Sequence, residues 1–519
     1  MFSRWMSPRL LLVAAAILSA NADSAPIVDL GYAQYQGIVS TSNITHFLGI
    51  RYAAAPLGDL RFRAPQPPAN VTGVQQATVQ PNQCFQASNG RSPTNPFETR
   101  AAQVISTEDC LFLNVFHPSD AAGAPVKDLP VLVWIHGGGY LGGQASAYNG
   151  EDVINQSNRG LVVVTLQYRL GFLPGSKVKA NGALNAGLLD QDFALRWVNK
   201  HIAKFGGNPN KVTIWGESAG AGSVLQQVVA NNGRTKPQLF RGAITSSTFL
   251  PSQYRYNDRI PEANCTAAVD TMACLRTTDA NVLQTANTQI NNGGFFGTFL
   301  FVPVVDGSFI TQRPTLSLLQ RKVNGAALLS VTNTHEGDVF VDQSTGATAN
   351  ATKYALDLFP NLRAASAREV GRLYAGLGTP LEQVNYVQGE SIFVCPTYFM
   401  LDAFRGRSFK GEFAIPPGLH ANDVAYYWPT LSTPSFQNKA FIDAFAQSFT
   451  SFAISLDPNV KVSPTITPKW DKWDIAHGRA EMNFNRTVEG APVVEAVRTD
   501  GGLLERCRFW ESVGSMTGQ

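Results

Sequence analysis

The chain contains 519 residues and has a formal net charge of only +3 at neutral pH. A charge so near balance argues against nucleic acid or an anionic membrane as the main partner. The length alone suggests about three domains, but no Pro- or Ser-rich linker, charge block or internal repeat divides the chain, so we expect one large domain with long insertions.

The first 22 residues have the form of a signal peptide. Arg4 and Arg9 precede an apolar run over 10–18, and residues 20–22 (ANA) have the small-x-small pattern that signal peptidase cleaves. The rival interpretation is a membrane anchor, but a span needs roughly 20 apolar residues, about twice the length of this run. We therefore expect a secreted mature protein, residues 23–519, with a charge near +1 after loss of the two arginines and no stable membrane insertion.

Six cysteines, an even number in a chain that we expect to be exported, predict disulfide bonds. None of them forms a Cys-x-x-Cys pair, so we expect no zinc or other metal site. Asn-x-Ser/Thr sequons are candidate glycosylation sites in a eukaryotic host. These sequons begin at Asn43, Asn70, Asn155, Asn264, Asn350 and Asn485.

Two apolar runs rich in β-branched residues, Leu129–Ile135 and 161–166, predict strands that are buried on both faces of a parallel sheet. An amphipathic pattern over 188–205 predicts a helix. Residues 212–215 predict a short strand, and residues 221–229 a second helix. This alternation of strands and helices indicates an α/β fold with a mainly parallel sheet covered on both faces.

The pattern Gly-x-Ser-x-Gly, residues 216–220 (GESAG), stands between the strand at 212–215 and the following helix. A serine hydroxyl needs exposure and a neighbouring base to act as a nucleophile. At this junction the pattern forces a sharp turn that lifts Ser218 clear of the sheet, and its glycines relieve crowding. The pentapeptide alone could be an ordinary turn, but its position favours a nucleophile.

The strand Leu129–Ile135 ends in residues 136–139 (HGGG). Because glycine lets the backbone approach a substrate closely, the N–H groups of Gly138 and Gly139, together with that of Ala219, are candidates for stabilising an oxyanion. The alternative is a flexible glycine-rich loop. The GESAG motif downstream makes that alternative the weaker interpretation.

Seven histidines compete for the role of general base. A sharp Gly-x-Ser-x-Gly turn of this kind is called a nucleophile elbow, and in folds that contain one the chain order runs serine, acid, histidine. This order leaves His420 and His477 if the acid lies near residue 336. His420 precedes an aromatic segment, whereas His477 lies in a polar loop near the C-terminus and is expected at the surface. The pattern alone does not decide between them.

Together these motifs resemble the type B carboxylesterase and lipase family, which includes cholinesterases and many secreted fungal lipases and sterol esterases. Further matches run in the family's order over nearly the whole mature chain. They are residues 47–53 (FLGIRYA), 60–65 (LRFRAP), 108–115 (EDCLFLNV), 185–191 (NAGLLDQ) and 205–209 (FGGNP). The resemblance implies a single α/β-hydrolase domain over 23–519, with a central, mainly parallel sheet flanked by helices and long insertions.

By this resemblance the acid is Glu336, in residues 333–337 (NTHEG), and the base is His420, which Glu336 would hold in the correct tautomer. Asp338 and Asp306 are the rival acids. Glu217 is expected to anchor the elbow rather than to move protons.

Two positions depart from the family pattern. His335 precedes the acid, and Ala421 follows the histidine where glycine is usual. Both departures could alter the rim of the pocket, and neither removes a catalytic group. Ser247 is a candidate for supporting Glu336, although it could equally be a plain turn serine.

The resemblance also implies the disulfides Cys84–Cys110 and Cys265–Cys274, which leave Cys395 and Cys507 to pair with each other. The loop between Cys84 and Cys110 has the position of a lid in this family. It is mostly polar and shorter than the amphipathic flap of relatives that open on lipid droplets. It therefore favours an esterase acting on dispersed esters over an interfacially activated lipase.

The expected reaction is hydrolysis of carboxylic esters through an acyl-enzyme, without metal or cofactor, on a small-molecule or lipid ester. Phe295, Phe296, Phe299 and Phe301 could line an acyl or aryl pocket, although core packing is the commoner role. Acylglycerols, steryl esters and feruloyl-type aryl esters remain alternative substrates. The rivals from other classes are a non-catalytic adhesion homologue and a secreted peptidase with the same triad.

Overall fold

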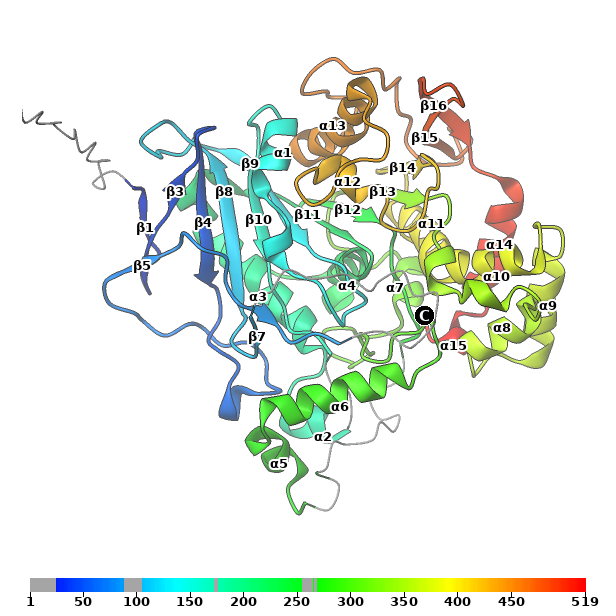
Figure 1. The fold of residues 1–519 in the computed structure, drawn as a ribbon, viewed down its shortest axis with the longest axis horizontal. Coiled ribbons are helices and arrows are strands. Elements are labelled where there is room, and N and C mark those ends of the chain that lie inside the picture. The colour runs from blue at the N-terminus through cyan, green and yellow to red at the C-terminus, as the bar shows by residue number, and fades with distance from the viewer. Residues whose placement is uncertain (1–24, 88–104, 172–175, 254–264, 266–267) are drawn as a thin grey trace, which may run out of the picture.

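The computed structural model describes residues 25–87, 105–171, 176–253, 265 and 268–519. The expected signal peptide, the sequon at Asn264 and most of the loop between Cys84 and Cys110 lie outside these residues. The described chain is built around an eleven-stranded sheet with helices on both faces (Figure 1). The fold is therefore of the expected α/β-hydrolase type.

The strand order in this sheet places seven mutually parallel strands at its centre. In spatial order the parallel strands are β15 (Ala480–Arg486), β14 (Ser408–Phe413), β13 (Ala327–Asn333), β12 (Gly242–Ser246), β11 (Gly207–Glu217), β9 (Leu129–Ile135) and β10 (Val162–Leu166). Antiparallel strands extend both edges. They are β16 (Pro492–Arg498) beside β15, and β8 (Phe112–Pro118), β4 (Ile44–Arg51) and β3 (Ile38–Val39) beyond β10.

Two small sheets lie outside the main one. Their strands are β1 (Ile27–Asp29), β2 (Gln34–Gln36) and β5 (Val74–Gln76), and β6 (Gln83–Cys84) with β7 (Ser106–Thr107). The second small sheet joins the two ends of the Cys84–Cys110 loop. It therefore fixes the base of that loop against the body of the protein.

The elements around the elbow agree with the sequence predictions in kind and differ in extent. β9 has the predicted bounds. β11 begins earlier than predicted because Gly207 still pairs with Leu129 of β9, with a bulge before Val212. The first predicted helix is α3 (Ala186–His201), and the second is α4 (Ala219–Gly233), whose last turn loses helical geometry.

The remaining helices lie in the connections between strands and at the C-terminus. They are α1 (Gly150–Gln156), α2 (Ser176–Asn181), α5 (Thr271–Thr277), α6 (Ala280–Asn292), α7 (Pro314–Leu319), α8 (Ala351–Leu358), α9 (Ala364–Tyr374), α10 (Pro380–Gly389), α11 (Cys395–Phe404), α12 (Val424–Tyr427), α13 (Lys439–Ser455), α14 (Gly501–Ser512) and α15 (Gly514–Thr517). A π-helical turn, Glu390–Val394, joins α10 to α11.

Successive residues of β9 pack into different hydrophobic clusters because side chains alternate across a strand. Val133 and Ile135 belong to the cluster that α3 and α4 cover. Leu132 and Trp134 belong to the cluster that α13 covers. Both faces of this strand are therefore buried, which explains why its sequence is a continuous apolar run.

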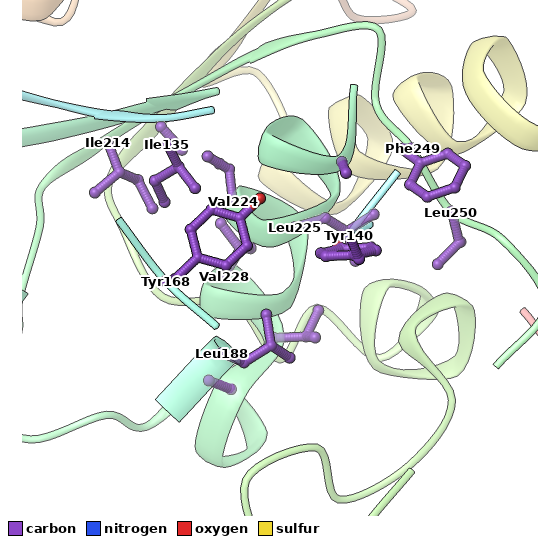
Figure 2. Close-up of a cluster of buried hydrophobic side chains, with 14 of the residues drawn as sticks. Ile135, Tyr140, Tyr168, Leu188, Ile214, Val224, Leu225, Val228, Phe249 and Leu250 are labelled. Atoms are coloured by element: carbon purple, nitrogen blue, oxygen red, sulfur yellow. The ribbon is translucent and has the colours of Figure 1, made fainter. Parts of the chain in front are cut away.

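The cluster that contains Val133 and Ile135 packs beneath the turn at residues 216–220, between the sheet and α4. In Figure 2, Ile135 from β9 and Ile214 from β11 lie beside Tyr168, close to Val224 and Val228 of α4. Burying a side chain of this size typically contributes about 1.5–3 kcal/mol. The strand and helix on either side of the GESAG motif are consequently held in a fixed relation to each other.

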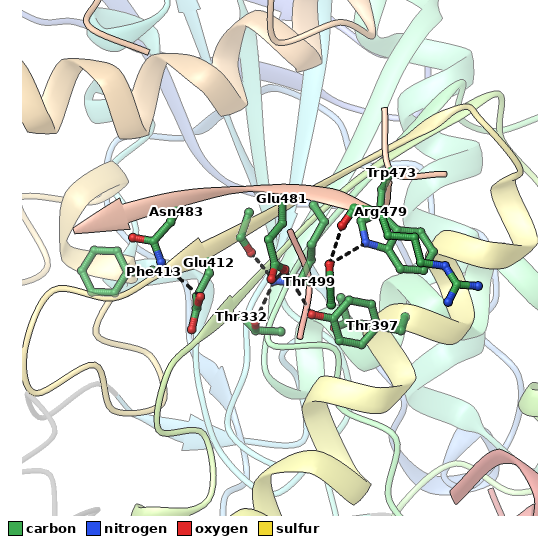
Figure 3. A network of polar contacts seen from close by, with 12 residues as sticks. Thr332, Thr397, Glu412, Phe413, Trp473, Arg479, Glu481, Asn483 and Thr499 are labelled. Carbon is green, nitrogen blue, oxygen red and sulfur yellow. Dashed lines mark hydrogen bonds and ion pairs between the residues drawn. The ribbon is translucent and has the colours of Figure 1, made fainter. Parts of the chain in front are cut away.

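A buried polar network ties β14 and β15 together beside α11 (Figure 3). The Lys410 ammonium lies 3.2 Å from a Glu481 carboxylate oxygen and donates to Thr332. Glu481 also accepts a hydrogen bond from the Tyr398 hydroxyl of α11. Loss of either member of the Lys410–Glu481 pair would leave the other charge buried without a partner, so the pair is costly to break.

Three disulfides link the described chain, and they are the three pairs expected: Cys84–Cys110, Cys265–Cys274 and Cys395–Cys507. The last joins α11 to α14 across 112 residues of sequence. Among the residues that the structure describes, none of the helices combines the length and apolar character needed to cross a bilayer.

Candidate active site

Ser218 occupies a sharp turn between β11 and α4. Its backbone has φ 55° and ψ −124°, a strained combination for a residue with a side chain. A Cβ at Gly216 would lie 2.3 Å from the Gly220 carbonyl carbon, and one at Gly220 would lie 2.0 Å from the Ile135 oxygen. Only glycine therefore fits at both positions, and the turn exists because of them.

The helix that follows Ser218 directs free N–H groups towards the serine. Ala219 is the first residue of α4, so its N–H has no carbonyl one turn earlier to bind. The N–H of Ser218 donates to the Ser246 carbonyl oxygen, at 2.9 Å, which ties the elbow to the end of β12. The serine side chain is mostly buried, with 8% of the residue exposed.

The HGGG loop lies against the elbow. A Cβ on Gly137 would come within 3.1 Å of the Ser218 Cβ. Gly138 and Gly139 both have positive φ, 102° and 64°, a conformation that glycine adopts without strain. Among the described residues, neither of their N–H groups has an acceptor. These groups can therefore hydrogen-bond a substrate.

His420 and Glu336 form a buried hydrogen-bonded pair. The Nδ1 of His420 and the Oε2 of Glu336 are 2.6 Å apart, and both residues are at most 5% exposed. Glu336 follows β13, and His420 lies in the connection between β14 and α12. The chain brings them together through a bridge between the backbones of His335 and Leu419.

Two further donors hold the Glu336 carboxylate. The Ser247 hydroxyl and the Asn333 backbone N–H each donate to Oε1 at 2.7 Å. The Asn333 side chain donates in turn to Ser247 and to Asp423. With both oxygens bound, the carboxylate of Glu336 cannot rotate away from His420, so it sets the orientation of the imidazole ring.

The other ring nitrogen of His420 faces Glu217. Its Nε2 lies 3.2 Å from Glu217 Oε1, without the angle of a hydrogen bond. Burial would lower the pKa of His420, but the charge and hydrogen bond of Glu336, with smaller contributions from Glu217 and Asp423, outweigh it and raise that pKa above its ordinary value. Nε2 has no other partner among the described residues and is free to accept a proton.

Two acids beside this pair hold protons more tightly than usual. Burial raises the pKa of Glu217 to about 8, against an ordinary value of 4.5. Burial also raises the pKa of Asp423, although hydrogen bonds from Tyr427 and Asn333 oppose the shift. Burial therefore favours the uncharged form of Glu217, and Glu336 is the acid that is hydrogen-bonded to His420.

Aromatic rings enclose one side of the site. Phe340 and Phe393 pack on the His420 ring, with centroids 4.9 and 4.5 Å away. Phe299 lies against Gly139, where a Cβ would come within 2.1 Å of its ring, and it also packs on Phe249. An apolar acyl or aryl group bound beside the glycine loop would contact these rings.

The structure brings together Ser218, Gly138, Gly139 and Ala219 at one end of the parallel strands, with Glu336 and His420 paired beside them. It places the rivals elsewhere. His477 is exposed and contacts Asp474. Asp306 binds Asn185 and the backbone of its own loop.

The remaining predicted neighbours of the site separate in the same way. Asp338 is half-buried and interacts with His335 and Asn385. Of the four phenylalanines proposed to line a pocket, Phe299 lies against Gly139 of the glycine loop. Phe295, by contrast, is 41% exposed and packs on Tyr354.

Sequence reasoning missed several residues of this site. Asn333 and Asp423 flank the acid and the base in the chain, but no spacing indicates that they meet. Glu217 was expected only to anchor the elbow, and its contact with His420 could not be read from the motif. Phe340 and Phe393 are single aromatic residues in separate segments, so only the tertiary structure shows that they share the histidine.

Within the described parts of the chain, no group of three or more histidine, cysteine, aspartate or glutamate side chains is placed to hold a metal ion. The polar atoms of the site are instead arranged around a serine, a histidine and a carboxylate. This set is suited to acyl transfer through a covalent intermediate.

Comparison with known proteins places these residues in a wider context. The sequence model of the carboxylesterase family matches residues 24–510. Carboxylesterase patB of Penicillium expansum is 27% identical over 94% of this chain and 96% of its own length. Secreted lipase 1 of Botryotinia fuckeliana is 33% identical over 61% of each chain. The crystal structure of Aspergillus niger EstA superposes with a TM-score of 0.82 and 29% identity, covering 96% of this chain and 99% of EstA.

Proposed function

Because the chain belongs to the carboxylesterase family and is a carboxylic ester hydrolase, we propose that Ser218 is its nucleophile, His420 its general base and Glu336 the acid that orients the base. These three residues follow the C-terminal ends of β11, β14 and β13, three parallel strands at the centre of the sheet. The hydrogen bond between His420 and Glu336, buried and supported by Ser247, is the observation that favours these roles most.

In the first half of the reaction, Nε2 of His420 takes the proton of the Ser218 hydroxyl as its oxygen attacks the ester carbonyl. The tetrahedral intermediate collapses when the protonated His420 gives that proton to the departing alcohol. In the second half, a water molecule loses its proton to the same nitrogen and attacks the acyl-enzyme. The acid is released and the serine hydroxyl is restored.

Three backbone donors would stabilise the negative oxygen of each tetrahedral intermediate. They are the N–H groups of Gly138, Gly139 and Ala219, the last at the N-terminus of α4. Each such donor is typically worth about 3–4 kcal/mol in the transition state. Glu336 stabilises the imidazolium of His420 that forms with the tetrahedral intermediate in each half of the reaction.

We propose that the substrates are dispersed esters with an apolar acyl or aryl group. The wall formed by Phe249, Phe299, Phe340 and Phe393 beside the glycine loop supports an apolar group. The polar composition of the Cys84–Cys110 loop supports esters in solution rather than a lipid surface. Secreted lipase 1 is a relative named for lipase activity, so emulsified acylglycerol is the comparison that any assay must include.

We also propose that the protein is secreted and glycosylated. Three disulfides are typical of an oxidising compartment. The sequon asparagines at 43, 70, 155 and 350 are exposed, and Asn485 is half-buried. Recovery of the protein from the medium of a eukaryotic host would test secretion. The mass of each sequon peptide before and after removal of glycans would test glycosylation.

The decisive experiment compares wild type with Ser218→Ala on short and long nitrophenyl esters, emulsified triacylglycerol, a steryl ester, methyl ferulate and an anilide. We expect rapid hydrolysis of dissolved esters, negligible anilide cleavage and a loss of turnover on the order of a million-fold in Ser218→Ala. Ser344→Ala, at an exposed serine, should match wild type.

An organophosphate should label Ser218 in a ratio of one per chain. Absence of label, or more than a few per cent of activity in Ser218→Ala, would refute the nucleophile. A sharp rise in rate above the solubility limit of a triacylglycerol would favour a lipase instead.

A further inference from the structure

The glycine loop from Gly138 to Gly143 has to be held from outside, because its own sequence offers little rigidity. Gly138, Gly139 and Gly143 all have positive φ, and glycine-rich backbone is the most flexible kind. Oxyanion donors act through preorganisation, since they must already point at the developing charge. The contacts that fix this loop therefore bear directly on the rate of the reaction.

One side of the loop rests on the core. The Tyr168 hydroxyl donates to the His136 carbonyl oxygen at 2.8 Å, and its ring stacks on the histidine. Within the loop, the N–H groups of Leu141 and Gly142 both donate to the Gly138 oxygen. A Cβ at Gly143 would lie 2.3 Å from the Gly137 oxygen, so the end of the loop folds back on its start.

The other side of the loop contacts the base of the disulfide loop. The side-chain amide of Gln86 donates to the Gly143 carbonyl oxygen at 3.0 Å and accepts from the Gly143 N–H at 3.4 Å. The Ala87 N–H donates to the Leu141 oxygen at 2.8 Å. Gln86, two residues after Cys84, thus forms hydrogen bonds with both the N–H and the carbonyl oxygen of Gly143.

Gln86 is itself fixed on two sides. Its backbone oxygen accepts a hydrogen bond from the Gln284 side chain of α6. Cys84, two residues earlier, is bonded to Cys110 and lies in the small sheet β6–β7. The backbone of Gln86 is therefore held by the hydrogen bond from α6 and by the nearby disulfide.

We infer that Gln86 is a positioning residue for catalysis, which holds the glycine loop so that the N–H groups of Gly138 and Gly139 point at the oxyanion. This inference rests on the proposed function, since it assigns those groups to the oxyanion. Gln86 touches neither Ser218 nor His420 in the contacts described, so its effect must pass through Gly143 and the loop.

The test is Gln86→Met, which keeps the length of the side chain and removes both hydrogen bonds to Gly143. Losing an oxyanion donor outright typically lowers kcat on the order of 10²–10³-fold, so a displaced loop should lower it less, by about 10- to 50-fold. KM should stay within about twofold, because the loop acts mainly on the transition state. The matched control is Gln144→Met, at a half-buried glutamine of the same loop region whose amide oxygen has no hydrogen-bond partner in the described chain.

A trifluoromethyl ketone gives a second measurement that a merely structural role would not move. Addition of the serine to such a ketone creates an oxyanion, so its affinity should fall by the same factor as kcat in Gln86→Met. The pH profile of kcat should keep its shape, because the triad is unaltered. If Gln86→Met does not fold, Gln86→Asn, whose amide is one methylene too short to reach Gly143, replaces it in both measurements.

The inference is overturned if kcat and ketone affinity stay within twofold of wild type in the folded variant. It is also overturned if KM alone changes, or if Gln144→Met loses as much kcat as Gln86→Met. Failure of the proposed function looks different, because wild type itself would then not hydrolyse esters or Ser218→Ala would remain active.

Discussion

Replacing Glu217 with glutamine should stabilise the protein, and the gain should grow as the pH rises from about 5 to about 8. The reason is that Glu217 is buried beside His420, and burial raises its pKa from 4.5 to about 8. In that interval the folded protein keeps a proton that the unfolded chain has released. Its free energy of unfolding must therefore fall with rising pH, and glutamine, which does not titrate, removes that dependence.

The size of the effect follows from the two pKa values. One bound proton changes the free energy of unfolding by about 1.36 kcal/mol per pH unit. Over the interval from 4.5 to about 8, the total is at most about 5 kcal/mol. A positive charge on His420, 3.2 Å away, offsets part of it, whereas the neighbouring acids Asp423 and Glu336 oppose ionisation of Glu217. We therefore expect Glu217→Gln to gain about 2–4 kcal/mol at pH 8 relative to pH 5.

Equilibrium urea unfolding of both proteins at pH 5, 6, 7 and 8 measures this difference. The two stability curves should lie close together at pH 5 and diverge steadily above it. Glu495→Gln, on the exposed face of β16, is the control and should follow wild type at every pH. Parallel curves for wild type and Glu217→Gln would refute the reasoning, because they would mean that Glu217 ionises in the folded protein as it does in the unfolded chain.

Three further substitutions test other parts of the structure. Glu336→Gln should lower kcat on the order of 10³–10⁴-fold with little change in melting temperature, because it favours the wrong tautomer of His420. A loss below tenfold in steady-state kinetics would contradict this role. Lys410→Met should lower the free energy of unfolding by about 3–5 kcal/mol, because it leaves Glu481 buried without its cation, and an unchanged urea midpoint would argue against that pair. Ala421→Gly should raise the free energy of unfolding by about 0.5–1 kcal/mol and the melting temperature slightly. The reason is that Ala421 has φ 66°, which glycine adopts without strain. A lower melting temperature would argue against strain at this residue.

Much of the parallel core was predictable because its signals are local. The run Leu129–Ile135 became β9 with the same bounds, since a strand buried on both faces needs an unbroken apolar sequence. The edges of other elements were less certain. β11 starts at Gly207 rather than at Val212 because pairing with β9 extends the strand into a polar segment, and strand pairing is not visible in a single sequence.

The candidate site divides in the same way. GESAG and HGGG are short, contiguous motifs whose chemistry follows from where the strands end, so Ser218 and the glycine N–H groups could be named in advance. Glu336 and His420 are 84 residues apart and depended on the resemblance to a family for their selection. The structure pairs them at 2.6 Å and leaves His477 at the surface.

By itself the sequence determined the kind of fold and indicated which residues are candidates for the chemistry. Motifs and apolar periodicity are properties of neighbouring residues, and the number of cysteines is a property of the composition. Only the tertiary structure decided the environment of those residues. Segments that are distant in the chain bury Glu217 and so raise its pKa. Distant segments also meet in the hydrogen bond from Ser247 to Glu336 and in the hydrogen bond from Gln86 to Gly143. Such contacts depend on the packing of the whole sheet and its helices, and a linear pattern does not encode them locally.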